Sequence, residues 1–156
     1  MSGRLETFLV LDPGGTTGWS TWLLPADGPL EPIDHGMIPG GLHGFIRWWR
    51  DIHDSDPGFD FVVSESFILD GRTAKPDITP LHIEGALAVF CSELGLPLYY
   101  QRNVYKAHAP DELLRRLGYY WPGAGHDRDS ARHAIAYALT QRHMPTLMAI
   151  HPPPAR

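Results

Sequence analysis

The sequence predicts an α/β domain in which helices flank a five-stranded mixed sheet, and three observations support this fold class. The chain has 156 residues, the length of one compact domain. Three β-type segments come first, and segments of helical and β-type periodicity then alternate along the chain. A hairpin meander followed by helix–strand crossovers gives antiparallel and parallel pairs in one sheet, with helices on its faces.

The first three strands are expected within the first forty residues. Residues 7–12 are an apolar run that ends in Asp12, and a Pro-Gly-Gly-Thr-Thr-Gly turn follows them. Residues 18–24 are typical of a second strand, so the first two strands should form a hairpin. Residues 33–38 give a weaker third strand.

Two further strands and four helices complete the predicted fold. Residues 59–64 are β-rich and lead directly into Glu65, and residues 98–101 form a short strand. Helical spacing of apolar residues, or a glycine or proline at the end of the segment, indicates the helices. The four helical segments are residues 42–53, 81–94, 110–117 and 127–141.

The order of these elements predicts where the two acidic strand ends meet. The strand that ends in Asp12 is expected to lie centrally, beside the strand that leads into Glu65. Pro145 follows the last predicted helix and ends it. We therefore expect a single domain over residues 1–145 and a C-terminal tail over residues 146–156.

Charge is distributed unevenly along the chain. The net charge of −5 at pH 7, taken alone, argues against DNA binding. Residues 1–100 carry a balance of −9, whereas residues 101–156 carry +4. The basic C-terminal third can therefore face phosphates while the rest stays acidic. The alternative is ordinary unevenness without a function.

Cysteine use and hydropathy indicate the cellular compartment. The single cysteine, Cys91, excludes an intrachain disulfide and fits a reducing cytosol. No apolar run approaches the ~20 residues of a membrane span, and no signal peptide is visible. We expect a cytoplasmic protein without a membrane partner.

Two carboxylates follow strands that are expected to be neighbours. Asp12 alone is better explained as a residue that caps the turn after its strand. Glu65 changes this interpretation, because a carboxylate at the end of a buried strand is costly unless it is paired or binds a metal. Parallel neighbours would place Asp12 and Glu65 side by side, and Mg²⁺ or Mn²⁺ would relieve their repulsion.

A third acidic element opens the last predicted helix. His126 and Asp129 are three residues apart and share one helix face, and His133 follows Asp129 by four residues. Asp127 points elsewhere and can cap the helix. The alternative is that Asp127 and Asp129 merely complement the helix dipole. With Asp12 and Glu65 already placed, we favour a functional role for Asp129 and His126.

These motifs together resemble a known family. The run Leu-Asp-Pro-Gly-Gly-Thr-Thr-Gly at residues 11–18, then Val-Val-Ser-Glu at residues 62–65, then His126 and Asp129, resembles the RuvC-like Holliday junction resolvases. The resemblance is strongest to the small forms that bacteriophages encode. It implies an RNase H-like fold and a homodimer that cuts branched DNA with two Mg²⁺ ions, for which Mn²⁺ can substitute.

The same resemblance implies roles for individual residues. Asp12 would bridge both metal ions, Glu65 would bind one of them, and Asp129 would complete the acidic set. His126 stands where members of the family have His or Asp, and would bind a metal or move protons. Lys106 follows the fifth strand, where the family often has a lysine near the scissile phosphate.

The loop after Glu65 is the expected DNA reader. Phe67 can stack on or wedge against an unpaired base at a branch point, or it can simply complete the core. Arg72 and Lys75 in the loop, and Arg128 and Arg132 on the last helix, are candidates for phosphate contacts. Arginines on helices also occur as plain solvated residues. The apolar segment 81–94 is the expected dimer interface.

Three other functions share parts of this pattern. The glycine-rich turn also resembles the phosphate loop of actin-like ATPases and sugar kinases, but those need two such domains and a longer chain. An RNase H that cuts RNA–DNA hybrids usually has its second acid on a helix, whereas Glu65 follows a strand. A non-catalytic nucleic-acid-binding module would have no reason to hold repelling carboxylates together. The choice among junctions, flaps and forks stays open.

Overall fold

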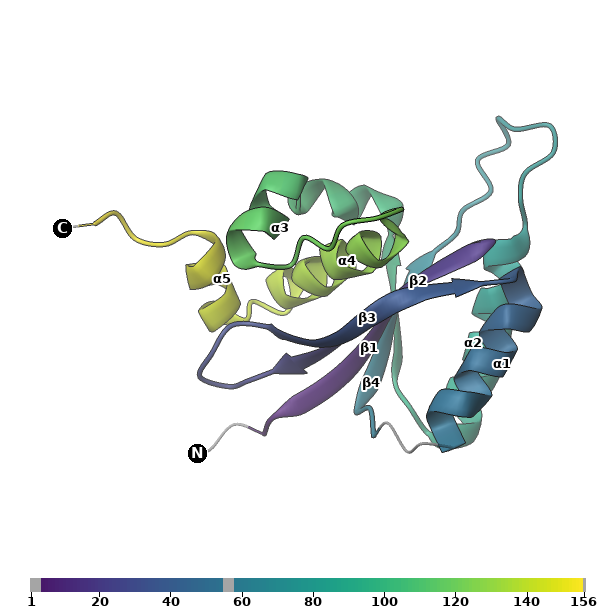
Figure 1. The fold of residues 1–156 in the computed structure, drawn as a ribbon, viewed down its shortest axis with the longest axis horizontal. Helices are drawn as coiled ribbons and strands as arrows, with labels where there is room; N and C mark the ends of the chain where they lie inside the picture. The colour runs from purple at the N-terminus through teal and green to yellow at the C-terminus, as the bar shows by residue number, and fades with distance from the viewer. Residues whose placement is uncertain (1–3, 55–57, 156) are drawn as a thin grey trace.

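The computed structural model describes residues 4–54 and 58–155 and contains a five-stranded mixed sheet with helices on both faces (Figure 1). The strand order is β3-β2-β1-β4-β5, with β1 in the centre. The first three strands are antiparallel neighbours, and β4 runs parallel to both β1 and β5. The predicted fold class is confirmed. The strands are β1 (Glu6–Asp12), β2 (Thr16–Leu24), β3 (Glu31–Pro39), β4 (Phe61–Ser66) and β5 (Leu98–Arg102).

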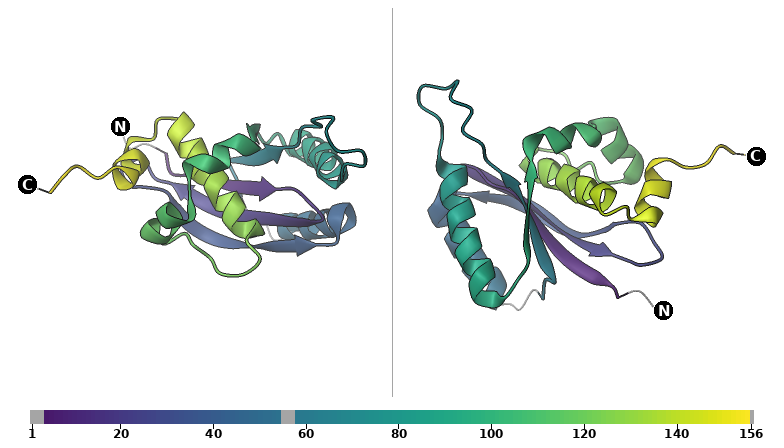
Figure 2. Two further views of the ribbon diagram at one scale, coloured as in Figure 1. Left: turned by 90° about the horizontal axis from the view of Figure 1, so that it is seen from above. Right: turned by 180° about the vertical axis from the view of Figure 1, so that it is seen from behind.

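The helices divide between the two faces of the sheet. Helices α1 (Gly41–Asp54) and α2 (Thr79–Leu94) cover one face, and α4 (His126–Thr140) covers the other together with α3 (Asp111–Leu117) and α5 (Met144–Ile150). The views from above and from behind show the same two layers (Figure 2). A 3₁₀ helix, η1 (Asn103–His108), follows β5. Within the described residues, no helix is long and apolar enough to span a membrane.

Side chains alternate between the two faces of the sheet along the central strand, β1, and this alternation decides on which face Asp12 lies. In β1, Phe8 and Val10 belong to the core under α4, whereas Leu9 and Leu11 belong to the core under α1 and α2. A strand buried on both faces has an unbroken apolar run, as residues 8–11 of this strand do. Alternation continues to Asp12, which therefore lies on the α4 face with Phe8 and Val10.

Three local differences separate the structure from the sequence-based prediction. Strand β4 begins and ends two residues later than expected, so Glu65 lies inside the strand. Neither η1 nor α5 was expected, because segments of six and seven residues are too short to show a period, and neither is followed by a glycine of the kind that indicated the equally short α3. Pro145 lies in the first turn of α5, and α4 ends earlier, at Thr140.

Helix α5 packs on the core. Its Thr146 and Ile150 are buried, and the Leu30 amide donates a hydrogen bond to Thr146 Oγ1 over 3.0 Å. Part of the segment expected as a tail is thus an ordered helix. The domain boundary at residue 145 stays a prediction.

One glycine allows α4 to approach the sheet closely. Gly18 is the β2 partner of Asp12 in the sheet register. A Cβ atom built on Gly18 would lie 1.8 Å from the carbonyl oxygen of His126, the first residue of α4. The atoms that this Cβ would meet belong to the backbone of His126 and Asp127, so relieving the clash requires the backbone of α4 to move. The missing side chain at position 18 is what lets the start of α4 lie beside the end of β1.

Replacing Gly18 by Ala should therefore destabilise the protein. Overpacking of this kind costs roughly 1–3 kcal/mol, because the backbone of α4 must move away from β2. Denaturant unfolding followed by circular dichroism measures the change. Gly15→Ala is the matched control, since a Cβ there meets no atom within 4 Å. Equal stability of the two variants would contradict this account of the close approach.

Candidate active site

Asp12 and Glu65 meet at the carboxyl ends of two parallel strands. The register pairs Leu11 with Ser64, so the next residues along each strand, Asp12 and Glu65, are neighbours across the pair. Glu65 follows Phe61 and Val63 on the α4 face, as Asp12 follows Phe8 and Val10. The predicted parallel pairing of these two strands is confirmed.

Lys106 lies between three carboxylates. Its Nζ is 2.6 Å from Glu65 Oε2, 3.3 Å from Asp12 Oδ2 and 3.3 Å from Asp129 Oδ2. The three acids come from β1, β4 and α4, and the lysine comes from η1. The structure thus brings together four of the residues that the sequence singled out. We call Asp12, Glu65, Asp129 and Lys106 the acidic cluster.

Burial and mutual repulsion make the cluster electrostatically unfavourable. Burial, together with the neighbouring Glu65 carboxylate, raises the pKa of Asp12 to about 8. Burial would also raise the pKa of Glu65, but hydrogen bonds from His133 and Lys106 outweigh it and lower that pKa to about 2. Burial acts to lower the pKa of Lys106, yet the Asp12 and Glu65 carboxylates raise it above its ordinary value.

Asp129 is held from two sides. Its Oδ2 faces Lys106, and its Oδ1 accepts a hydrogen bond from Arg132 Nε over 3.1 Å. Arg132 is only 15% exposed and also binds Asp111 and the carbonyl oxygen of Ala109. The guanidinium therefore fixes the first turn of α4 against the loop before α3. Its expected contact with DNA stays a prediction.

His126 does not join the cluster. It is exposed at the first residue of α4, and no hydrogen bond or ion pair to a carboxylate is found for it in the described part of the chain. The Asp127 carboxylate, one residue later, is buried and lies 2.8 Å from His35 Nδ1 on β3. The His35 ring stacks on Trp121, with 3.8 Å between centroids. Asp127 thus fastens the start of α4 to β3 and does not face the acids.

Sequence reasoning missed two residues that support Glu65. His133 is fully buried on α4, and its Nε2 lies 2.8 Å from Glu65 Oε2. Its Nδ1 lies 2.8 Å from the side-chain amide of Gln101 on β5. The spacing of His133 four residues after Asp129 was visible in the sequence. Its contact with a strand residue was not, because that depends on how α4 docks on the sheet.

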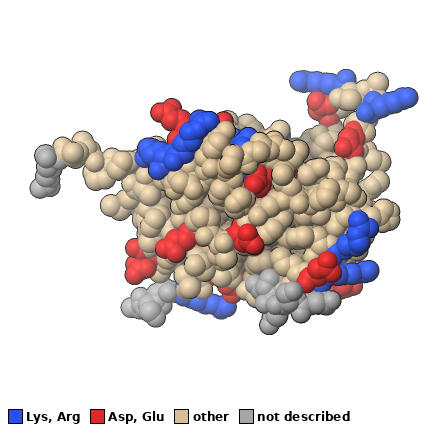
Figure 3. Space-filling model, in the orientation of Figure 1, with Lys and Arg blue, Asp and Glu red and all other residues tan. Residues whose placement is uncertain are grey.

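The residues expected to read DNA lie in different settings. Phe67 is half-buried, and its amide donates to the Glu84 carboxylate on α2. Arg72 and Lys75 are exposed in the loop between β4 and α2, where Figure 3 shows basic side chains projecting from the body of the protein. Arg128 donates to the carbonyl oxygen of Trp121 over 2.7 Å, so it is engaged within the protein.

The donor set fits a divalent cation, although no preformed site is present. In residues 4–54 and 58–155, no group of three or more Asp, Glu, His or Cys side chains is arranged to hold a metal ion. In the acidic cluster the Lys106 ammonium lies between the three carboxylates. The three acids supply carboxylate oxygens, and hard oxygen ligands of this kind suit Mg²⁺ or Mn²⁺.

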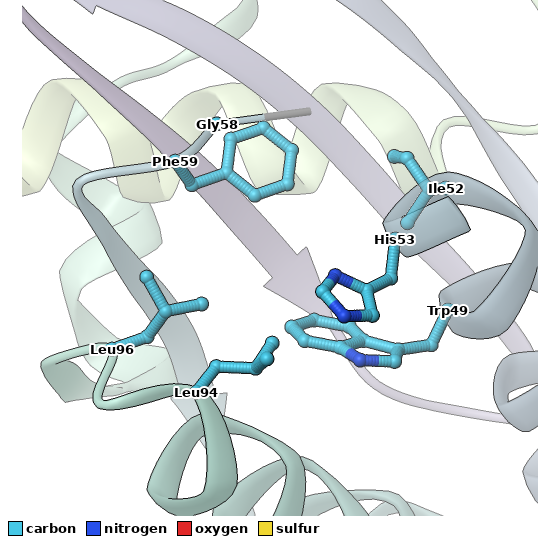
Figure 4. A pocket seen from close by; sticks show the side chains of 7 residues that line it. All are labelled: Trp49, Ile52, His53, Gly58, Phe59, Leu94 and Leu96. Carbon is cyan, nitrogen blue, oxygen red and sulfur yellow. The ribbon is translucent and has the colours of Figure 1, made fainter. Parts of the chain in front are cut away.

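An apolar cavity lies at the other end of β4. It has a volume of about 150 Å³ and is lined by Trp49, Ile52, His53, Gly58, Phe59, Leu94 and Leu96 (Figure 4). These residues come from the end of α1, the segment before β4 and the end of α2. The lining contains no carboxylate, so the acidic cluster remains the candidate active site.

The comparisons with solved structures support the fold. RuvC of Thermus thermophilus in complex with a Holliday junction substrate has a TM-score of 0.70 at 15% identity, covering 90% of this chain and 97% of that one. The Thermus thermophilus RuvC structure has a TM-score of 0.66 at 17% identity, covering 87% and 95%. The fowlpox virus Holliday junction resolvase has a TM-score of 0.61 at 12% identity, covering 86% and 99%.

These likenesses give the chain the fold of the RuvC-like resolvases, as the sequence motifs implied. No family model matches the sequence. No curated protein matches it either. The comparisons therefore support the fold, at identities too low to carry function by themselves.

Replacing Asp12 by Asn should stabilise the protein in the presence of a metal chelator. The pKa of Asp12 is about 8 in the folded protein, against an ordinary value of 3.8. Between these pH values the folded state keeps a proton that the unfolded chain has lost, so wild-type stability falls as pH rises. The advantage of Asp12→Asn should grow across this window and be complete above about pH 8. Urea unfolding at several pH values measures it, and an advantage independent of pH would contradict the assignment.

Lys106→Met should change the stability in the opposite direction in the same unfolding experiment. It removes the cation that the three carboxylates share, and buried acceptors left without a partner cost roughly 1–3 kcal/mol. This variant should therefore be less stable than the wild type near neutral pH. A stabilising effect of Lys106→Met would mean that the ammonium does not offset the repulsion among the acids.

Proposed function

We propose that this protein is a metal-dependent endonuclease that cleaves branched DNA in the manner of a Holliday junction resolvase. The observation that carries the proposal is the acidic cluster, in which Asp12, Glu65 and Asp129 converge at one end of a RuvC-like sheet. One of the similar structures is a RuvC bound to a Holliday junction. We place its action in the cytoplasm, on junctions and also on flaps or forks.

Asp12, Glu65 and Asp129 would hold the metal, and we propose two Mg²⁺ ions with Mn²⁺ as a substitute. Bound there, the metal would neutralise charge on the scissile phosphate and activate a water for attack. His126, exposed at the start of α4, is a further candidate ligand. The carboxylates themselves bind and orient, and none of them attacks phosphorus.

Lys106 would exchange partners when DNA binds. Its Nζ now contacts the three carboxylates, and its side chain is 20% exposed at the edge of the cluster. A phosphate oxygen brought to the cluster would compete for the ammonium, because an ammonium donates readily to phosphate. Lys106 would then stabilise negative charge on the phosphate. Its role in catalysis follows from this exchange.

A groove is lined both by Glu65 of the acidic cluster and by residues of the predicted DNA-reading loop. It has a volume of about 280 Å³. Phe67 and Ile68, from the loop after β4, and Arg102 and Val104, from the end of β5 and from η1, also line it. Apolar side chains beside an arginine suit a nucleotide, which combines a ring with a phosphate. Arg72, Lys75, Arg128 and Arg132 remain proposed phosphate contacts.

We also propose that the protein is a homodimer, because the proposed substrate is symmetric. A four-way junction offers two equivalent strands, and a twofold dimer would present two active sites symmetrically. Helix α2 exposes Val89 by 54%, on the side of the helix opposite the buried Leu87. Sedimentation equilibrium should therefore give the mass of two chains, and Val89→Lys should shift the protein toward monomer. A monomer at high protein concentration would contradict the proposed dimer.

The proposed activity is tested by incubating four-way junctions, flaps, linear duplex and RNA–DNA hybrid with the protein in Mg²⁺, in Mn²⁺ and in chelator. We expect paired symmetric nicks in the junction, only when a divalent metal is present. Asp12→Asn should lower the rate by about 10²–10³-fold or more, while junction binding in a gel-shift assay is retained.

The matched control is Asp27→Asn, which removes an exposed acid in the loop between β2 and β3. It should cleave at the wild-type rate. Wild-type cleavage by Asp12→Asn would overturn the assignment of the active site. Preferential cutting of the hybrid would instead identify an RNase H.

A further inference from the structure

We propose that His133, oriented by Gln101, is a positioning residue that holds Glu65 in the conformation in which it binds metal. The inference rests on the proposed function, because it assigns a role to a residue behind one of the proposed metal ligands. His133 does not reach the cluster's open side. It acts through Glu65.

The contact is fully enclosed by the protein. His133 has no exposed surface, and its Nε2 lies 2.8 Å from Glu65 Oε2. On its other side, Nδ1 lies 2.8 Å from the Gln101 side chain, which is 6% exposed. The three residues come from β4, β5 and α4, so the chain Glu65–His133–Gln101 crosses the interface between the sheet and its main helix.

Gln101 determines which nitrogen of His133 carries the proton. The amide satisfies both of its ends when its nitrogen donates to His133 Nδ1 at 2.8 Å and to the His133 carbonyl at 3.2 Å, and its oxygen accepts from the Tyr137 amide at 3.0 Å. Nδ1 is then an acceptor, so the single proton of a neutral imidazole is on Nε2. Nε2–H therefore donates to Glu65 Oε2.

A neutral donor suits this position. The Glu65 Oε2 atom also accepts from Lys106 over 2.6 Å, so two groups hold the same oxygen. Lys106 ends a long side chain that is 20% exposed and can change partners. The imidazole of His133 is fixed by packing and by Gln101. When Lys106 turns toward a phosphate, His133 keeps Glu65 in place.

Preorganisation of this kind should be visible in metal affinity. Partners behind a metal ligand fix its orientation, and their loss typically costs about 10–100-fold in affinity. Leucine at position 133 would fill much of the volume but donate nothing. Glutamine would present an amide N–H at a similar distance from the backbone and should restore much of the effect.

The experiment is a calorimetric titration of the full chain with Mn²⁺ and with Mg²⁺. We expect His133→Leu to bind Mn²⁺ about 10–100-fold more weakly than wild type, and His133→Gln to recover most of that loss. The matched control is His143→Leu, since His143 also bonds through both ring nitrogens, to Pro25 and Thr146, away from the acids. His143→Leu should lower stability but leave the Mn²⁺ affinity unchanged.

Two outcomes would overturn the inference. One is wild-type Mn²⁺ affinity in His133→Leu, and the other is an equal loss of affinity in His133→Leu and His143→Leu. If His133→Leu does not fold, Gln101→Met replaces it, because it removes the donor to Nδ1 and should also weaken Mn²⁺ binding. Wild-type affinity in Gln101→Met would then overturn the role of Gln101.

A spectroscopic test is independent of metal. Nitrogen-15 NMR of the metal-free protein should show the His133 ring protonated at Nε2 and not at Nδ1, and a proton at Nδ1 would overturn the inference. Failure of the proposed function is distinguishable from these results. If the wild type binds Mn²⁺ and follows the predicted order of variants but cuts no junction, the positioning role stands and the nuclease proposal falls.

Discussion

Repulsion among three carboxylates at one end of the sheet is the constraint around which this structure is organised. Asp12 and Glu65 are neighbours because β1 and β4 are parallel in a fixed register, and Asp129 joins them because α4 lies directly over Gly18. Such a grouping is unfavourable without compensation. The Lys106 ammonium and the His133 imidazole supply it at Glu65 Oε2, and the Arg132 guanidinium supplies it at Asp129.

Much of this arrangement could be predicted because it depends on strand alternation and helix periodicity. Apolar runs that end in Asp12 and Glu65 predict two buried strands, and a chain order of hairpin, helix and strand predicts that they are parallel neighbours. The spacing within each strand then places both acids on one face. Asp129 could be assigned from its position in the first turn of α4, which was predicted within one residue of where it begins.

The other contacts of the site depend on how α4 packs on the sheet, and local sequence patterns do not show this packing. His133 looks like any helical histidine until α4 is seated on the sheet and the ring lies between Glu65 and Gln101. The spacing of His126 and Asp129 suggested a shared role, yet the structure brings only Asp129 to the cluster, because the side chain of His126 at the helix start is exposed to solvent. The short elements η1 and α5 show no period and lack the following glycine that indicated the equally short α3, although η1 delivers Lys106.

How an acidic protein of this kind would bind DNA depends on which of its Lys and Arg side chains are exposed and which are bound within the protein. The basic C-terminal third suggested a phosphate-binding surface, but Arg132 is bound to Asp129 and Asp111, and Arg128 to the Trp121 carbonyl. Much of that charge therefore stabilises the protein itself. Exposed cations lie instead on the loop after β4, at Arg72 and Lys75, and at Arg102, which lines the groove together with Glu65. With few phosphate contacts, electrostatic affinity for plain duplex should be modest. Recognition of a branched substrate would then depend on shape, on stacking in the groove and on the charge of metal held by the three carboxylates.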